Sequence, residues 1–236
     1  MGTITLVRHG QASFGAANYD QLSALGQEQA RLLGLWLQDT APAPSRIALG
    51  PAQRHRQSAE HCLAVLPGAP QATQWQVHAG FDEFDHEAVL RAHQPAWISP
   101  AAIAQALKDA ERPRRAFQQV FAAAVSRWVA GELHAPGLET WADFQARCRA
   151  ALHQLTQERG QDVWVFTSGG VITALVQYVT GIPDARIFEL NWTLANAGVT
   201  KLLYRGGERT GEFSLAGLNS VAHLERHRRP ELITYR

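Results

Sequence analysis

Several features that would assign the chain to a special class are absent from its 236 residues. The 22 lysines and arginines nearly balance the 21 aspartates and glutamates, and the resulting net charge of +1 favours neither nucleic acid nor an anionic membrane as a partner. No apolar run approaches the roughly 20 residues that span a bilayer, and no basic start followed by an apolar segment marks a signal peptide. We therefore expect a cytoplasmic protein that binds no nucleic acid and no membrane.

Linkers, zinc-binding cysteines and phosphate-binding lysines are also absent. No Gly/Ser-rich or Pro-rich stretch and no block of charge divides the sequence, so we expect one domain over residues 1–236. Cys62 and Cys148 lie far apart in apolar-periodic segments, which predicts buried free thiols in a reducing compartment and no metal site. The only lysines, Lys108 and Lys201, follow no glycine-rich turn, which excludes a nucleotide-binding P-loop.

Apolar patterns predict an α/β fold with a mostly parallel sheet. Short buried strands are expected at residues 4–7, 47–49 and 162–167, with helices at 23–38, 54–66 and 171–180. Further strands are expected at 186–190, 199–204 and 212–215.

The segment from 87 to 158 has a helical pattern almost throughout. Its apolar residues recur at helix spacing, as in Phe117, Val120, Phe121, Ala124 and Trp128. We interpret about 87–135 as a helical insertion that covers the ligand-binding edge of the sheet and sets specificity.

The first predicted strand ends at Arg8-His9-Gly10. In α/β proteins the carboxyl edge of the sheet is where ligands bind. A guanidinium there offers donors matched to phosphate oxygens, and a neutral imidazole can attack phosphorus and carry the phosphoryl group. A strand-end histidine that merely bonds a carbonyl is the simpler alternative.

Two further side chains are expected at the same edge. Arg54 follows the second strand in the first turn of a helix, and with Arg8 it would neutralise a dianionic phosphoryl group. Glu83 lies between two aromatic residues in Phe81-Asp82-Glu83-Phe84 and is a candidate general acid for a leaving oxygen. A solvated helix arginine and a loop carboxylate are the respective alternatives.

Together these motifs resemble the histidine phosphatase superfamily, the phosphoglycerate mutase-like proteins. The resemblance runs in order from about Thr3 to Leu203. It is carried by Leu6-Val7-Arg8-His9-Gly10, Leu22-Ser23-Ala24-Leu25-Gly26, Gly50-Pro51-Ala52-Gln53-Arg54, Phe81-Asp82-Glu83, Gly137-Leu138-Glu139-Thr140 and Asn196-Ala197-Gly198.

The resemblance implies a three-layer α/β/α fold and specific roles. His9 would be the nucleophile, Glu83 the proton donor, and Arg8 and Arg54 the phosphate-binding arginines. The family usually has a second histidine before a Gly-Gly pair, and here Ser168 stands in that place, before Gly169. Ser168 and Gly169 are expected to bind phosphate as well.

The serine matters for turnover because it can donate a hydrogen bond but carries no charge. Loss of one well-placed donor from such a site costs on the order of 10²–10³ in rate. Gly15 also departs from the asparagine of the glycolytic mutases, and Gln11 or Ser13 could supply that contact. Residues 16–21 match no further mutase segment, so phosphatase activity is favoured over phosphoglycerate mutase activity.

The leading hypothesis is a metal-independent phosphatase without a cofactor, acting on a small phosphorylated substrate through a phosphohistidine. The alternative is a weakly active or non-catalytic protein that binds a phosphorylated ligand, and a homodimer is left open. Ser168 as the nucleophile of a Gly-x-Ser-x-Gly elbow is disfavoured because Phe166 occupies the first glycine position. His223 and His227 are interpreted as part of a solvated basic tail.

Overall fold

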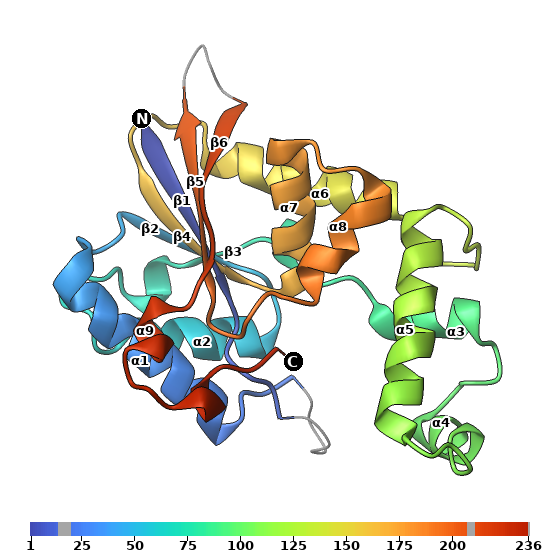
Figure 1. Cartoon of the computed structure of the whole chain (residues 1–236). Coiled ribbons are helices and arrows are strands. Elements are labelled where there is room, and N and C mark those ends of the chain that lie inside the picture. Colours follow the sequence, from blue (N-terminus) through green and yellow to red (C-terminus); the bar gives the residue numbers. More distant parts are fainter. Residues whose placement is uncertain (14–19, 207–210, 236) are drawn as a thin grey trace.

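The computed structural model describes residues 1–13, 20–206 and 211–235. Within these ranges a six-stranded sheet has the order β3-β2-β4-β1-β5-β6 (Figure 1). The strands are β1 (Gly2–Arg8), β2 (Arg46–Leu49), β3 (Gln76–Val77), β4 (Asp162–Thr167), β5 (Val199–Arg205) and β6 (Glu212–Ser220).

The centre of the sheet is parallel and one side is antiparallel. β1 pairs with β4, β4 with β2, and β2 with β3, all in parallel. β5 runs antiparallel to β1, and β6 antiparallel to β5. The β1–β4 register places Arg8 opposite Thr167, so these two strands end at the same edge of the sheet.

Alternating side chains of each central strand enter two separate cores. In β4, Val163 and Val165 pack in the larger core, whereas Trp164 and Phe166 pack in the smaller one. Successive side chains of a strand point to opposite faces of the sheet, so a strand that is buried on both faces needs an unbroken apolar run. This explains why the sequence of β4 reads as a continuous hydrophobic segment.

Helices cover both faces of the sheet (Figure 1). The smaller core is closed by α1 (Ala24–Thr40) and α2 (Gln53–Leu63). The larger core is closed by α6 (Trp141–Leu155), α7 (Gly169–Thr180) and α8 (Asp184–Asn191). The expected layered α/β/α arrangement is confirmed.

The segment after Glu83 forms α3 (His86–His93), α4 (Pro100–Ala106) and α5 (Pro113–Val129), which extend away from the sheet (Figure 1). Ala124 and Trp128 of α5 are buried in the larger core. Phe117 stacks on Trp97, with ring centroids 6.0 Å apart. The helical character expected for this part is confirmed, and the arginine cluster of Arg112, Arg114 and Arg115 is exposed.

The predicted strand at 186–190 is wrong, because these residues belong to α8. Pro183 begins the helix at its N-cap and Asp184 carries a negative charge in the first turn, which favours a helix start. Ile187 and Phe188 are both buried although they are adjacent, which a strand with one buried face would not allow. The short apolar run at 186–190 was compatible with a strand or a helix, and packing of these residues against neighbouring helices favours the helix.

Other boundaries differ less. α2 ends at Leu63 rather than residue 66, and β6 extends to Ser220. β3 was not predicted, because it has only two residues and both are exposed. Short 3-10 helices lie at Ala72–Gln74 (η1), Ala79–Phe81 (η2) and Pro230–Leu232 (η4). Cys62 and Cys148 are buried free thiols, as predicted.

None of the helices in the described ranges combines the length and apolarity needed to cross a bilayer.

The C-terminal segment packs against α1 and does not lie in solvent. The prediction that His223 belongs to a solvated tail is therefore wrong. This residue, in α9 (Ala222–Glu225), is 1% exposed and lies 6.2 Å from the Trp36 ring. Leu224 and Leu232 are fully buried against Leu32 of α1. Burial, followed by the nearby His227, lowers the pKa of His223 to about 4.

Acid should therefore destabilise the fold through His223. Its pKa is about 4 in the folded chain and near 6.5 when unfolded, so the stabilisation is complete above pH 6.5 and is lost as the pH falls toward 4. The effect amounts to about 1.4 kcal/mol per pH unit in that window. We expect His223→Leu to lose less unfolding free energy than wild type between pH 7 and pH 5, by roughly 2 kcal/mol in urea titrations.

The matched control is His134→Leu, since His134 is exposed. This variant should keep the pH dependence of the wild type. Equal pH dependence of wild type and His223→Leu would contradict the prediction.

Candidate active site

His9 follows the last residue of β1 and is almost fully buried. Its amide donates to the Thr167 carbonyl over 2.9 Å, which continues the β1–β4 pairing by one residue. Its ring Nδ1 lies 2.7 Å from the Gly10 carbonyl oxygen. A carbonyl only accepts, so Nδ1 carries the proton and the Nε2 lone pair is available for attack.

Close backbone packing sets the path of the chain after His9. A Cβ at Gly10 would collide with the Gly26 backbone in α1, and a Cβ at Gly26 would collide with Gln11. The Gly10 amide donates to Ser58 Oγ over 3.0 Å, and Ser58 in turn donates to the Arg54 carbonyl over 2.7 Å. Gly10 and Gly26 thus allow the loop after His9 to pack closely between α1 and α2.

A turn before β5 holds the backbone of His9 from the other side. The His9 carbonyl accepts from the Ala197 amide and from Asn196 Nδ2, each over 3.2 Å. The Asn196 amide donates to the Thr234 carbonyl over 2.8 Å. Gln29 donates to both the Leu232 carbonyl (2.8 Å) and Thr234 Oγ1 (2.9 Å), so residues near the C-terminus support the same loop.

The first turn of α2 contributes a cation and a second imidazole. Arg54 Nη2 lies 3.4 Å from Ser168 Oγ, and Arg54 Nη1 forms an ion pair of 2.7 Å with Asp20. His55 Nε2 lies 2.6 Å from Ser168 Oγ, and both residues are completely buried. The His55 ring centroid is 5.8 Å from that of His9.

The positive charges around His9 affect both imidazoles. Burial, and then the charges of Arg54 and Arg8, hold the pKa of His9 well below its usual value. Burial and Arg54 lower the pKa of His55 to about 3. Both rings are neutral at neutral pH, and the two arginines supply the positive charge of the site.

Arg8 approaches the start of α7. Its Nη1 donates to the carbonyls of Leu194 and Tyr235, the second over 3.4 Å. A Cβ at Gly169 would lie 3.5 Å from Arg8 Nε, so Gly169 and this guanidinium are neighbours. The helix N-terminus and the arginine both favour an anion at this point.

Glu83 lies at the same helix N-terminus. Its Oε2 accepts from the Gly170 amide over 3.1 Å, and its Oε1 accepts from the Phe84 amide over 3.2 Å. A Cβ at Gly170 would overlap the Glu83 carboxylate, so glycine is required for this approach. A carboxyl group is therefore held beside Ser168 and Gly169, close to the phosphate-binding candidates.

Arg147 of α6 holds the backbone that carries Glu83. Its Nε and Nη2 bind both Glu139 oxygens, over 2.6 and 3.0 Å. Its Nη1 donates to the Asp82 carbonyl over 2.8 Å, and its Nη2 reaches the Glu83 carbonyl at 3.4 Å. One guanidinium thus joins Glu139, from the Gly137–Thr140 motif, to the turn before Glu83.

The structure brings most of the predicted site residues together. A chain of contacts joins His9, Arg54, Ser168, Gly169, Arg8 and Glu83 at the carboxyl ends of β1, β2 and β4. Gln11 instead contacts the start of α1, where its Oε1 accepts from Ser23 Oγ over 2.8 Å. The Ser13 amide bonds the Gln21 carbonyl over 2.7 Å, and Gly15 lies outside the described residues.

Three contributors were missed by the sequence analysis: His55, Asp20 and Arg147. His55 follows Arg54 directly, and that adjacency was the only available signal. Asp20 and Arg147 act through ion pairs with Arg54 and Glu139, which no local pattern reveals.

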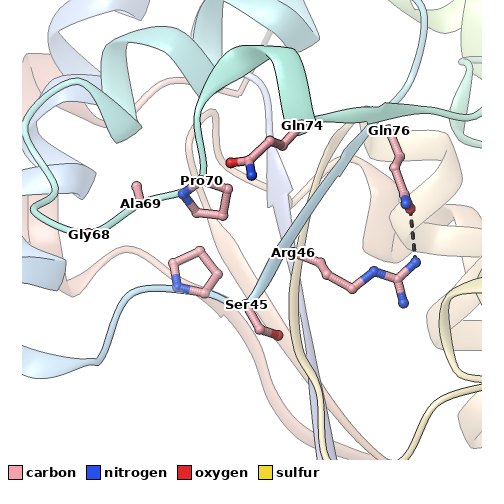
Figure 2. Close-up of a pocket in the computed structure, with 8 residues that line it drawn as sticks. Ser45, Arg46, Gly68, Ala69, Pro70, Gln74 and Gln76 are labelled. Atoms are coloured by element: carbon pink, nitrogen blue, oxygen red, sulfur yellow. Dashed lines mark hydrogen bonds between the residues drawn. The ribbon is translucent and has the colours of Figure 1, made fainter.

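A separate cavity of about 520 Å³ lies at the opposite end of β2. Figure 2 shows Arg46, the first residue of β2, hydrogen-bonded to Gln76 over 2.9 Å, with Gly68, Ala69 and Pro70 nearby. This cavity is at the amino end of the strand and does not include the His9 cluster. Across the described ranges, no group of three or more His, Cys, Asp or Glu side chains could hold a metal ion.

Removing the Arg147 guanidinium should destabilise the fold, because Glu139 and two half-buried carbonyls would lose their donor. We expect Arg147→Met to cost about 2–3 kcal/mol of unfolding free energy in urea. The matched control is Arg127→Met, whose ion pair with Glu132 is about half exposed and should contribute at most about 0.5 kcal/mol. Equal losses in the two variants would contradict this role for Arg147.

A family model matches most of the chain. The model of the histidine phosphatase superfamily (branch 1) matches residues 4–111 and 106–214. The sequence matches none of the curated proteins.

Solved structures with a similar fold include phosphatases and a mutase. Mycobacterial glucosyl-3-phosphoglycerate phosphatase with inorganic phosphate has a TM-score of 0.65 at 21% identity, covering 94% of this chain and 99% of that one. Phosphoglycerate mutase from Bacillus anthracis has a TM-score of 0.63 at 17% identity, covering 96% of both chains. YhfR of Bacillus stearothermophilus has a TM-score of 0.66 at 19% identity, covering 94% and 99%. With its family match over most of its length, the chain belongs to the histidine phosphatase superfamily.

Proposed function

We propose that the protein hydrolyses phosphomonoesters through a phosphohistidine formed on His9. The observation that carries this proposal is the His9 ring itself. Its Nδ1 is bonded to the Gly10 carbonyl, and its pKa is held well below the usual value, so Nε2 is an unprotonated nucleophile at neutral pH.

The surrounding charges suit a phosphoryl group. Arg8 comes from the end of β1 and Arg54 from the first turn of α2; both charges act on His9, and their guanidinium donors match phosphate oxygens. Asp20 pairs with Arg54 in the structure, so a phosphate dianion would compete with a carboxylate for that guanidinium. The amide ends of α7 add further partial positive charge.

The reaction has two steps. His9 Nε2 attacks phosphorus, the N–P bond forms as the P–O bond to the alcohol breaks, and Glu83 gives the leaving oxygen its proton. Water then attacks phosphorus, Glu83 takes a proton from it, and the N–P bond breaks to release phosphate and restore His9. Arg8, Arg54, Ser168 and Gly169 stabilise the charge on the equatorial oxygens in both steps.

A second candidate is a protein that binds a phosphorylated ligand without turnover. Ser168 favours it, because a neutral hydroxyl stands where the resemblance leads one to expect an imidazole. Phosphatase activity is preferred over mutase activity because the segment after Gly15 lacks the further mutase motif, although both kinds of protein share this fold.

The helical segment 87–135 is proposed to set substrate specificity. Two aromatic contacts connect the site with α5. Phe84, next to Glu83, stacks on Trp128 with ring centroids 4.7 Å apart, and Trp192, next to the Asn191 that borders Gly169, lies 5.8 Å from the Phe121 ring. Trp192 is 43% exposed, which leaves an aromatic surface beside the site.

His9→Ala should abolish turnover of para-nitrophenyl phosphate, and wild-type protein quenched during turnover should carry an acid-labile phosphoryl group on His9. Arg56→Ala is the matched control, because Arg56 is exposed on the same helix as Arg54 and should leave the rate unchanged. Full turnover by His9→Ala would reject the phosphohistidine. Phosphate or vanadate binding without label or turnover would support the second candidate.

The His9 ring should remain neutral in mildly acidic solution. Its folded pKa lies below 6.5, so the nucleophilic form persists as the pH falls through 6.5 and is lost only at lower pH. In ¹⁵N spectra of histidine-labelled protein, the His9 resonances should not change as the pH falls through 6.5. Titration of the His9 ring through pH 6.5 would contradict the prediction.

A further inference from the structure

We propose that His55 is the second imidazole of the phosphoryl site, and that it acts by orienting the Ser168 hydroxyl toward a phosphoryl oxygen. The inference rests on the proposed function and adds a positioning residue to it. It also accounts for the serine at position 168, because the imidazole reaches the site from α2 instead of from the end of β4.

The contacts of Ser168 determine how its proton can be used. Its Oγ has Arg54 Nη2 at 3.4 Å on one side and His55 Nε2 at 2.6 Å on the other. The guanidinium can only donate. A phosphoryl dianion can only accept, so Ser168 can help to bind it only through its own O–H. We assign the short contact with His55 to the Nε2–H of the imidazole. This tautomer leaves Nδ1 unprotonated, buried against the Gly50 backbone and without a hydrogen-bond partner among the described residues.

With both partners donating, the two lone pairs of Ser168 Oγ are occupied and its O–H is the one remaining bonding direction. The hydroxyl is fixed before the ligand arrives, which avoids an ordering cost in the transition state. His55 therefore contributes without touching the substrate.

The surroundings of His55 are built for this ring. The residue is completely buried in the first turn of α2, next to the phosphate-binding candidate Arg54 and 5.8 Å from the nucleophile ring. A Cβ at Gly50 would collide with the His55 ring and with the Phe81 carbonyl, so the glycine at the end of β2 makes room for it. A buried imidazole without a task would cost stability that a leucine in this place would not.

The experiment compares variants of His55 by kcat on para-nitrophenyl phosphate and by affinity for orthovanadate. His55→Leu fills similar space without a donor, and we expect kcat to fall on the order of 10²-fold. His55→Gln retains an N–H donor and should keep more than a tenth of the wild-type kcat. Cys62→Ala, a buried change in the same helix and outside the site, should leave kcat unchanged per folded molecule.

A double-mutant cycle tests whether the two side chains act as one unit. Ser168→Ala should lower kcat about as much as His55→Leu, and the double variant should be no worse than either single variant. Independent, multiplicative losses would overturn the inference.

Moving the imidazole is the decisive variant. In His55→Ala/Ser168→His the ring comes from the end of β4, and kcat should recover at least tenfold over His55→Ala. Ser168→His alone should be impaired, because two fully buried positions would have to hold two rings. No recovery in a folded double variant, or a kcat for His55→Leu within threefold of wild type, would overturn the inference.

The vanadate titration separates this inference from the proposed function. If wild type binds vanadate but forms no phosphohistidine, the proposed function fails, and weaker vanadate binding by His55→Leu than by His55→Gln still supports the role of His55. If wild type is active and labelled on His9 while both variants bind vanadate and turn over like wild type, the role of His55 fails and the proposed function stands.

Discussion

Parallel pairing of β1 with β4 is the constraint on which the site depends. The register places Arg8 beside Thr167. The residues that follow these two strands, His9 and Ser168, therefore leave the sheet at neighbouring points. The His9 amide extends that ladder by bonding the Thr167 carbonyl. A shift of one residue would reverse the faces of a whole strand and separate these side chains, and the two apolar cores on either side of the sheet prevent it.

The site combines fixed charges with neutral rings. Burial makes a charged histidine expensive here, and two arginines nearby raise that cost further. Arginine retains its charge in such surroundings, so it supplies the positive field, and the imidazoles provide a lone pair or a hydrogen-bond donor. The absence of a charged second imidazole at Ser168 is therefore a smaller change than the substitution alone suggests.

The sequence was sufficient for the buried strands β1, β2 and β4, because strands buried on both faces require continuous apolar runs such as Val163 to Phe166. It also placed Arg8 and His9 at the edge of the sheet, because they stand at the end of the first strand, and the family resemblance pointed to Ser168. It did not reveal His55, whose direction depends on how α2 docks against Gly50 and the end of β4. The strand expected at 186–190 failed for a similar reason, since packing against neighbouring helices outweighed a short local pattern.

Residues near the end of the chain support the loop that carries His9. Thr234 bonds Asn196 and Gln29, and Asn196 in turn bonds the His9 carbonyl. The loop at residue 9 is thus closed by residues more than two hundred positions later in the sequence, and β1 must also find β4 across most of the chain. Contacts of such long range form late and slowly. During synthesis on the ribosome, β1 would wait for β4 and for the segment around Thr234, so the loop that carries His9 would be among the last parts of the molecule to acquire its structure.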